Sequence, residues 1–218
     1  LLRRNWKGEE PAEDEFDGFK QDLRRVQQAT DLPELLGAEG QAAARYFARF
    51  PSMITSRDGD WGCFEFAKRN RRPPTDPVNA LLSYAYSLLV RAWTVSLTAV
   101  GFDAYRGFYH QPRYGRPALA LDLMEPFRPL LADSTVIQAI NNGEVKPGDF
   151  ITRAGSVALT DAGRKAFIGT FERRMNQEVT HPVFGYRVSY RRLLELQSRL
   201  LARHLLGEIP EYPQFTTR

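Results

Sequence analysis

The sequence predicts a mainly α-helical, bundle-like domain, and one small β-hairpin is expected near residues 149–160. Three observations support this fold class. Apolar residues recur at helical spacing along most of the chain, and capping or terminating residues mark the ends of these segments. Strict alternation of apolar and polar residues is confined to one short stretch, FITRAGSVALT at 150–160. With 218 residues and a hydrophobic fraction of 43%, the chain can bury a substantial core.

The first two helices are expected on either side of residue 31. Phe16 to Thr30 is amphipathic, with apolar residues on one face. The second helix runs from about Pro33 to Phe50. Asp31 is placed to cap its N-terminus, and Glu34, three residues later, completes a capping-box pattern. Residues 52–78, rich in glycine and proline, are expected to be irregular.

A long apolar helix is expected from Ala80 to Phe102, ended by Gly101. Its length suits a bilayer span, but Arg91 lies near its middle, where an arginine costs about 2.5–3.5 kcal/mol on insertion scales. We therefore expect the buried central helix of a soluble bundle and no membrane partner.

The second half of the chain contains three more helical segments. One includes Asp122 and Glu125 and continues to about Asn142; if it is helical throughout, Pro126 must kink it. After the hairpin, residues 161–175 and 190–207 both show helical patterns.

Charge is unevenly distributed along the chain. The net charge is +4, which divides into −3 for residues 1–36 and +7 for residues 37–218, and 25 of the 30 cations are arginine. Arginine favours bidentate recognition of phosphate, so this balance permits nucleic-acid binding, although salt-bridged helix faces would explain it equally well. The single cysteine, Cys63, excludes an internal disulfide framework and fits a reducing cytoplasm.

Two carboxylates interrupt the apolar run ALALDLMEPF. Asp122 and Glu125, at i and i+3, share a helical face whose neighbours are apolar. One explanation is that they cap or pair with arginines such as Arg116 or Arg128. The other is that they belong to a metal site, which needs further ligands from elsewhere.

Two other residues are candidates for that role. His110 lies on a Gly- and Pro-rich loop that can fold back over the following helix, although a lone histidine is more often structural. Glu39 is flanked by Gly37 and Gly40, where small residues allow a close approach. Together with the acidic pair they form a mixed nitrogen and oxygen donor set that suits Mn²⁺ or Mg²⁺.

Arginines near these candidates could follow a DNA backbone. The run KRNRRPP contributes Arg69, Arg71 and Arg72, and the His110 loop contributes Arg113 and Arg116. Such a run is also compatible with an ordinary solvated surface. No phosphate-binding glycine loop, dinucleotide fingerprint, HExxH or CxxC motif is present.

Four segments in order resemble the CRISPR adaptation integrase family: LLGAEGQAAARYFARF, RRPPTDPVNALLSYAYSLL, GFDAYRGFYHQPRYGRPALALDLMEPFRP and the tail from LTDAGRKAFIGTFERRM to EIPEYPQF. The resemblance implies a helical C-terminal catalytic domain with a divalent metal, Mn²⁺ or Mg²⁺. The family's ligands fall on Glu39, His110 and Glu125, and Asp122 becomes a ligand or a close support. Asn79 and Arg113 also match motif positions, without assigned roles.

The resemblance further implies a domain plan and partners. Residues 1–30 would be a linker and first helix, and residues 31–218 the catalytic domain. The family's N-terminal β-rich dimerisation domain does not precede residue 16, and LLRRNW reads as the junction after it. Implied partners are prespacer and repeat duplex DNA, a second copy of the protein, the small adaptation partner that bridges integrase dimers, and a fused or associated end-trimming nuclease. The location would be prokaryotic cytoplasm. The alternative is a non-catalytic helical DNA-binding or oligomerisation module.

Overall fold

The computed structural model describes residues 1–7, 14–55 and 61–216. Packing divides the chain into two compact units: unit 1 is residues 1–83 and 136–166, and unit 2 is residues 84–135 and 167–218. Because the units follow packing and not chain order, they do not test the predicted division at residue 30.

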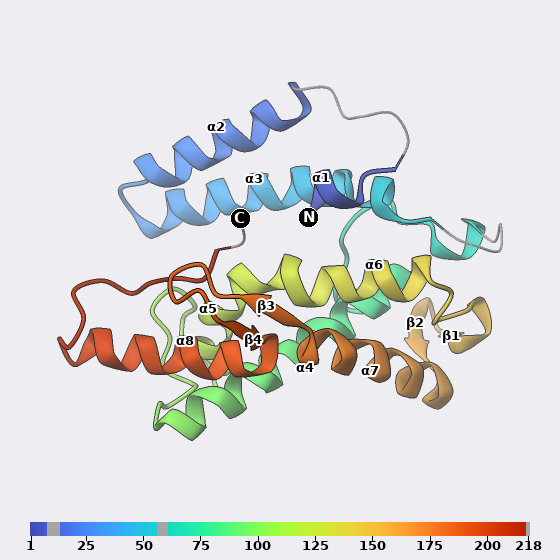
Figure 1. Ribbon diagram of the computed structural model, residues 1–218. Coiled ribbons are helices and arrows are strands. Elements are labelled where there is room, and N and C mark those ends of the chain that lie inside the picture. The colour runs from blue at the N-terminus through green and yellow to red at the C-terminus, as the bar shows by residue number, and fades with distance from the viewer. Residues whose placement is uncertain (8–13, 56–60, 217–218) are drawn as a thin grey trace. The chain divides into compact units, whose positions relative to one another are not determined.

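Helices make up most of the regular structure. In chain order they are α1 (Leu2–Asn5), α2 (Asp14–Gln28), α3 (Leu32–Ala48), α4 (Pro77–Val100), α5 (Ala118–Met124), α6 (Ser134–Asn141), α7 (Asp161–Asn176) and α8 (Tyr190–Leu205) (Figure 1). Two antiparallel hairpins pair β1 (Phe150–Arg153) with β2 (Ser156–Leu159), and β3 (Glu178–Thr180) with β4 (Arg187–Ser189). The mainly α prediction and the hairpin near 149–160 are confirmed. The second hairpin was not predicted, because strands of three residues are too short to show alternation.

In unit 1, α2 and α3 lie side by side as a helical hairpin (Figure 1). The predicted N-cap of α3 is confirmed, since Asp31 Oδ1 accepts a hydrogen bond from the Glu34 backbone N–H at 2.8 Å. The capping box is displaced by one residue, because Glu34 Oε2 accepts from the Thr30 backbone N–H at 2.9 Å. The predicted irregular segment contains two short 3₁₀ helices, Phe50–Met53 and Trp61–Phe64.

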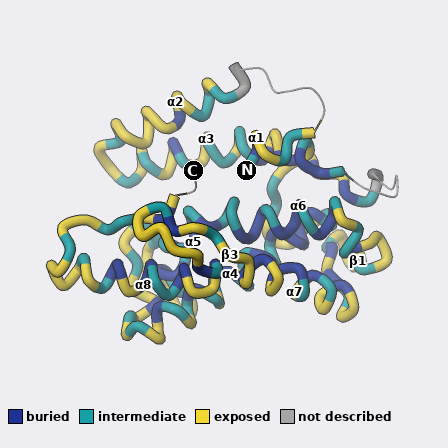
Figure 2. The backbone as a smooth tube through the Cα atoms, in the orientation of Figure 1, coloured by how far each residue is buried: buried dark blue, intermediate teal, exposed yellow. Residues whose placement is uncertain are grey.

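Helix α4 has one buried face and one exposed face. Leu89, Trp93 and Leu97 follow one another at helical spacing and are fully buried, and Trp93 packs edge-on against Phe127 at 5.2 Å. Figure 2 shows this division, because dark blue buried segments alternate with lighter, more exposed ones along the helix. Among the described helices, α4 alone is long and apolar enough to span a bilayer, and 39% of its most apolar window is buried. The predicted burial therefore holds for one face only.

The segment from 118 to 141 changes its winding three times. After α5 the chain forms a 3₁₀ turn, Glu125–Phe127, and then a π-helical segment, Arg128–Asp133, before α6 begins. Proline stands second in each of the two intervening segments, where its missing N–H interrupts regular α-helical bonding. Pro126 thus breaks the helix, as expected, but Pro129 adds a second break. π-helical turns are uncommon and often occur at functional sites.

In unit 2, His181 is enclosed by the β3–β4 hairpin. Its side chain is fully buried, and its ring lies 4.6 Å from Phe184 and 5.9 Å from Phe215 between centroids. Nδ1 lies 3.3 Å from the backbone nitrogens of Val183 and Phe184, so Nδ1 accepts and Nε2 carries the hydrogen. In the part of the chain that the structure describes, buried Nε2 has no hydrogen-bond partner. Burial lowers the pKa of His181, which favours the neutral ring.

This environment predicts a pH dependence of stability. Below about pH 6.5, His181 becomes protonated in the unfolded chain but stays neutral in the folded chain. The free energy of unfolding therefore falls as pH drops below that value, and it is independent of this histidine at higher pH. His181→Gln removes this titration. Urea denaturation between pH 5.5 and 7.5 measures the free energy of unfolding of both proteins. The difference between wild type and variant should become smaller as pH is lowered. Parallel profiles would contradict this account.

Candidate functional site

The loop that carries His110 is folded back onto the start of α5. The Ala104 carbonyl accepts hydrogen bonds from the first-turn N–H groups of Leu119 and Ala120, at 3.0 and 3.4 Å. Gly107 permits this approach, since a Cβ there would lie 2.7 Å from Asp122 Oδ2 and 2.9 Å from the Ala118 backbone. The predicted fold-back is confirmed, and it depends on the absence of a side chain at Gly107.

Asp122 holds the loop in place with its carboxylate. Oδ2 accepts from the backbone N–H groups of Phe108 and Tyr109 at 2.6 and 3.0 Å, and Oδ1 accepts from the backbone N–H of His110 at 2.8 Å. A fourth contact joins Oδ1 to His110 Nδ1 at 2.6 Å. A carboxylate has about four acceptor positions, so Asp122 is fully occupied. Its side chain is 9% exposed, and these contacts offset the cost of that burial.

The same contacts orient the His110 imidazole. An ionised carboxylate only accepts hydrogen bonds, so Nδ1 carries the hydrogen and the lone pair of a neutral ring is on Nε2. Within the described residues no hydrogen bond to Nε2 is found, and the side chain is 18% exposed. A carboxylate that fixes the tautomer of a histidine in this way is typical of metal-binding histidines.

Glu125 is held by a different contact. Its Oε2 accepts a hydrogen bond from Arg128 Nη1 at 2.7 Å, and its side chain is 29% exposed. The structure therefore contains the contacts expected if the acidic pair is structural: Glu125 pairs with Arg128, and Asp122 caps backbone N–H groups. Both arrangements also fix carboxylates that a metal site would need in a defined position.

Glu39 lies in α3 and is half-buried. A Cβ added at Gly37 or Gly40 would meet no atom within 4 Å. Within the described structure, therefore, no other segment packs closely against either glycine. Glu39 belongs to unit 1, whereas His110, Asp122 and Glu125 belong to unit 2. The predicted ligand set thus draws on both units, and its assembly stays a prediction.

The donor chemistry fits a divalent cation within unit 2. His110 offers an oriented imidazole nitrogen, and Glu125 offers a carboxylate with one oxygen engaged by Arg128. Residues 1–7, 14–55 and 61–216 contain no group of three or more His, Cys, Asp or Glu side chains that could hold a metal ion. Unit 2 therefore offers two held donors, and a metal site would need at least one more.

Of the predicted DNA-binding arginines, Arg69 has an internal role. Its guanidinium donates to Asn79 Oδ1 at 2.7 Å and to Ser83 Oγ at 3.1 Å. The fully buried Asn79 side chain also accepts from the Asn70 N–H and donates to the Lys68 carbonyl and to Asp76, which completes its four hydrogen bonds. These two residues therefore tie the basic loop to the start of α4, a role that the sequence did not reveal.

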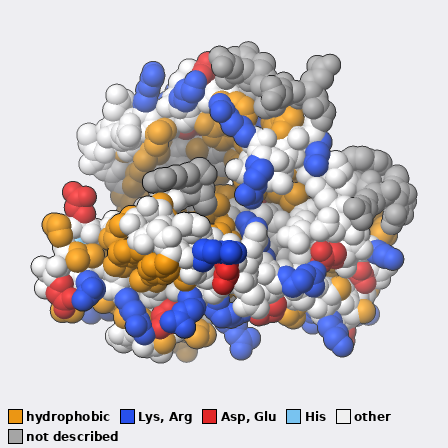
Figure 3. All heavy atoms as spheres, viewed as in Figure 1, with side chains coloured by type: hydrophobic (Ala, Val, Ile, Leu, Met, Phe, Trp, Pro, Cys, Tyr) orange, Lys and Arg blue, Asp and Glu red, His pale blue; other side chains and the backbone are white. Residues whose placement is uncertain are grey.

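The remaining predicted arginines are more accessible. Arg71 and Arg72 are exposed in unit 1, and in unit 2 Arg113 is exposed while Arg116 is half-buried. Three aromatic side chains of the same loop, missed in the sequence, are also exposed: Tyr105, Phe108 and Tyr114. Figure 3 shows lysine and arginine side chains scattered over the visible face and interspersed with acidic ones.

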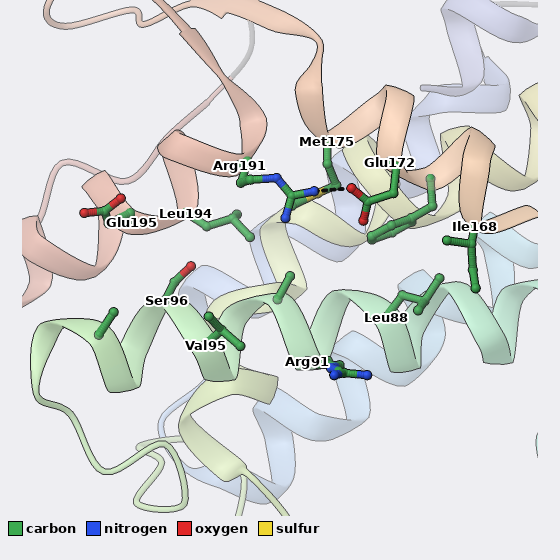
Figure 4. A pocket seen from close by; sticks show the side chains of 13 residues that line it. Leu88, Arg91, Val95, Ser96, Ile168, Glu172, Met175, Arg191, Leu194 and Glu195 are labelled. Carbon is green, nitrogen blue, oxygen red and sulfur yellow. Dashed lines mark hydrogen bonds and ion pairs between the residues drawn. The ribbon is translucent and has the colours of Figure 1, made fainter.

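A separate groove of about 460 Å³ lies within unit 2 between α4, α7 and α8. Its lining is mainly apolar, including Leu88, Val95 and Ile168, and the ion pair of Arg191 with Glu172 lies at its edge (Figure 4). None of the predicted ligands lines it, so the groove is not part of the candidate site.

Comparison with known proteins gives a consistent result. The sequence model of the family described as CRISPR associated protein Cas1 matches residues 1–173. A relative from Geobacter sulfurreducens, "CRISPR-associated exonuclease Cas4/endonuclease Cas1 fusion", is 61% identical over 222 residues. That match covers 100% of this chain but 40% of the relative, so the chain spans less than half of the length of that protein.

Two solved structures are similar in fold. The first, titled "Casposase bound to integration product", has a TM-score of 0.78 and 27% identity, and the match covers 88% of this chain and 55% of that one. The second, titled "Partial Cas6-RT-Cas1--Cas2 complex", has a TM-score of 0.78 and 28% identity, with coverage of 93% and 58%.

The geometry around Asp122 leads to a stability prediction. Asp122→Ala leaves three backbone donors without their acceptor and should lower the free energy of unfolding by about 2–3 kcal/mol. Amide hydrogen exchange should accelerate at Phe108, Tyr109 and His110. Asp103→Ala is the matched control, because exposed Asp103 accepts a single N–H in the same loop, and it should cost less than about 1 kcal/mol. Equal costs for the two variants would contradict the capping role.

Proposed function

Because the chain belongs to the Cas1 family of CRISPR-associated proteins, we propose that it is the catalytic region of a metal-dependent DNA integrase and endonuclease that inserts spacer DNA into a CRISPR array. The observation that carries the proposal is the His110–Asp122 pair, which orients the imidazole so that Nε2 keeps its lone pair, and Asp122 lies three residues before Glu125 in the chain. The relatives' names and the integration-product title of a similar structure support the same activity.

Each residue has a distinct role in this proposal. His110 and Glu125 would hold Mn²⁺ or Mg²⁺ together with Glu39, and Asp122 would orient His110 without binding the ion. When bound, such a cation polarises a phosphodiester and lowers the cost of the charge that develops on it.

The reaction itself is an in-line transesterification. The 3′-hydroxyl of a spacer strand attacks a phosphodiester of the array, one P–O bond forms, and the P–O bond to the displaced target-strand oxygen breaks. In the nuclease reaction, water takes the place of that hydroxyl. The chain's own contribution is positioning, because the loop fixed by Asp122 sets the place of His110, and the exposed arginines hold the flanking phosphates.

The proposed partners follow from the same family membership. They are duplex DNA of the prespacer and the array repeat, a second copy in the intact protein, and the small adaptation partner. The Cas1–Cas2 complex among similar structures supports the last of these, and the fusion relative supports a joined or associated end-trimming nuclease. A prokaryotic cytoplasmic location belongs to the proposal as well.

A second candidate function is a non-catalytic helical module that binds DNA or promotes oligomerisation. The observation in its favour is that Asp122 and Glu125 both have protein partners, which is enough to explain their presence in an apolar run. The two functions differ in metal uptake, because the non-catalytic module predicts no binding of Mn²⁺ in calorimetry.

The catalytic proposal predicts loss of strand transfer when the ligands are removed. In the intact protein, His110→Ala and Glu39→Ala should each reduce integration of a 3′-hydroxyl donor about 100-fold or more, since the cation supplies several kcal/mol. Glu208→Gln, at an exposed ion pair, is the control and should retain wild-type rates. A 3′-blocked donor should fail with every variant. Full metal-dependent transfer by folded His110→Ala and Glu39→Ala proteins would refute the assignment.

Phosphate contacts can be tested through salt dependence. Arg71→Ala and Arg113→Ala should weaken DNA binding equally across sequences and each reduce the slope of log affinity against log salt by about 1. Arg203→Ala serves as the control, because Arg203 is paired with Glu208, and its slope should match wild type. Fluorescence anisotropy at several salt concentrations measures these slopes. Unchanged slopes for the first two variants would remove them from the interface.

A further inference from the structure

A connected set of side chains in unit 2 leads from a buried carboxylate to Glu125. Asp133 is 2% exposed, and its Oδ1 accepts a hydrogen bond from the Tyr86 hydroxyl at 2.7 Å. The Arg128 guanidinium carbon lies 4.3 Å from the centroid of the Tyr86 ring. Arg128 in turn donates to Glu125 Oε2 at 2.7 Å. One path of contacts therefore runs Asp133, Tyr86, Arg128, Glu125.

The side chains along this path differ in charge. Burial and then the Asp133 carboxylate raise the pKa of Tyr86, so the phenol stays protonated and donates. Arg128 carries a permanent positive charge, because a guanidinium is not deprotonated in proteins. The path thus alternates a carboxylate, a neutral phenol, a cation and a carboxylate. Each neighbour stabilises the next in one orientation.

The backbone that carries three of these residues is itself fixed. Arg128 and Asp133 are the two ends of the π-helical segment. Between them, the Leu130 carbonyl accepts hydrogen bonds from Arg174 Nε and Nη2, at 2.9 and 2.6 Å, and from Ser134 Oγ at 2.6 Å. Arg174 belongs to α7 and is 9% exposed. Side chains therefore stabilise the unusual winding that places Arg128 against Tyr86 and beside Glu125.

We infer that Tyr86 and Asp133 are positioning residues for Glu125, acting through the Arg128 guanidinium. Arg128 engages Oε2 and holds the carboxylate plane, which directs the second oxygen, Oε1, toward a bound cation. A mobile arginine on a flexible stem would pair with Glu125 equally well at the surface but would not fix its orientation. The inference rests on the proposed function, because it gives Glu125 a cation to bind.

The test measures Mn²⁺ affinity of the intact protein by isothermal titration calorimetry, alongside urea denaturation. Residues that orient metal ligands typically change metal affinity roughly 10–100-fold when altered. We expect Arg128→Ala to weaken Mn²⁺ binding about tenfold and Tyr86→Phe, which keeps the ring but loses the hydroxyl, about three- to tenfold. Tyr84→Phe is the matched control. Tyr84 lies two residues before Tyr86 on α4, and its ring packs at a tilt against Phe167 of α7, so the Mn²⁺ affinity of this variant should equal that of wild type.

A double-mutant cycle separates positioning from a general loss of stability. If Tyr86 acts through Arg128, adding Tyr86→Phe to Arg128→Ala should cause no further loss of Mn²⁺ affinity. A purely structural role would instead lower the free energy of unfolding of both backgrounds and leave the dissociation constant of the folded protein unchanged. Asp133→Asn, which retains an acceptor for the Tyr86 hydroxyl, should weaken binding less than Asp133→Ala.

Glu125→Gln distinguishes the possible failures. If Glu125→Gln weakens Mn²⁺ binding while Tyr86→Phe does not, or if the Tyr86 and Arg128 effects are additive, the inference is overturned and the proposed function stands. If Glu125→Gln leaves the affinity unchanged, or wild type takes up no Mn²⁺, the proposed function fails and the inference fails with it.

Discussion

The Asp122 carboxylate, which accepts from three consecutive backbone N–H groups and from the His110 ring, determines the geometry of the candidate site. A loop without regular structure would otherwise need water to satisfy those donors, and its histidine would have no fixed tautomer. The lack of a side chain at Gly107 is part of the same constraint, because a Cβ there would collide with Oδ2. Loop path, ring orientation and burial of a charge in an apolar run therefore have one common cause.

Glu125 is fixed by a different physical principle. Asp122 is immobilised by neutral backbone donors, whereas Glu125 is held by a cation whose own position depends on an aromatic ring and a buried carboxylate. The first arrangement uses all acceptor positions of its carboxylate, and the second engages one oxygen. This difference suits the two acids to the unlike roles of the proposed function, in which Asp122 would orient the ligand His110 and Glu125 would itself be a ligand.

Local patterns in the sequence were enough for α2, α3, α4, α7 and α8, the α3 cap and the first hairpin, because each depends on residues within a few positions of one another. They did not reveal the hydrogen bond of Arg69 to Asn79, which lies ten residues away on α4, and the predicted DNA contact of Arg69 stays a prediction. The π-helical segment was missed for a related reason. Pro129 predicts a break in the α-helix, but the π-helical winding is stabilised by Arg174, which lies far along the chain. The meeting of Glu39 with the other ligands depends on both units and stays a prediction.

Whether the acidic pair is structural or catalytic turns on His110 more than on either acid. Capping the loop requires only the backbone N–H groups of residues 108–110, which any residue other than proline would provide. A purely structural site has no use for an imidazole whose Nδ1 adds a fourth bond to Asp122 and whose Nε2 keeps its lone pair near the surface. The choice of histidine at this position is the feature that backbone capping leaves unexplained and that the proposed ligation of a cation would explain.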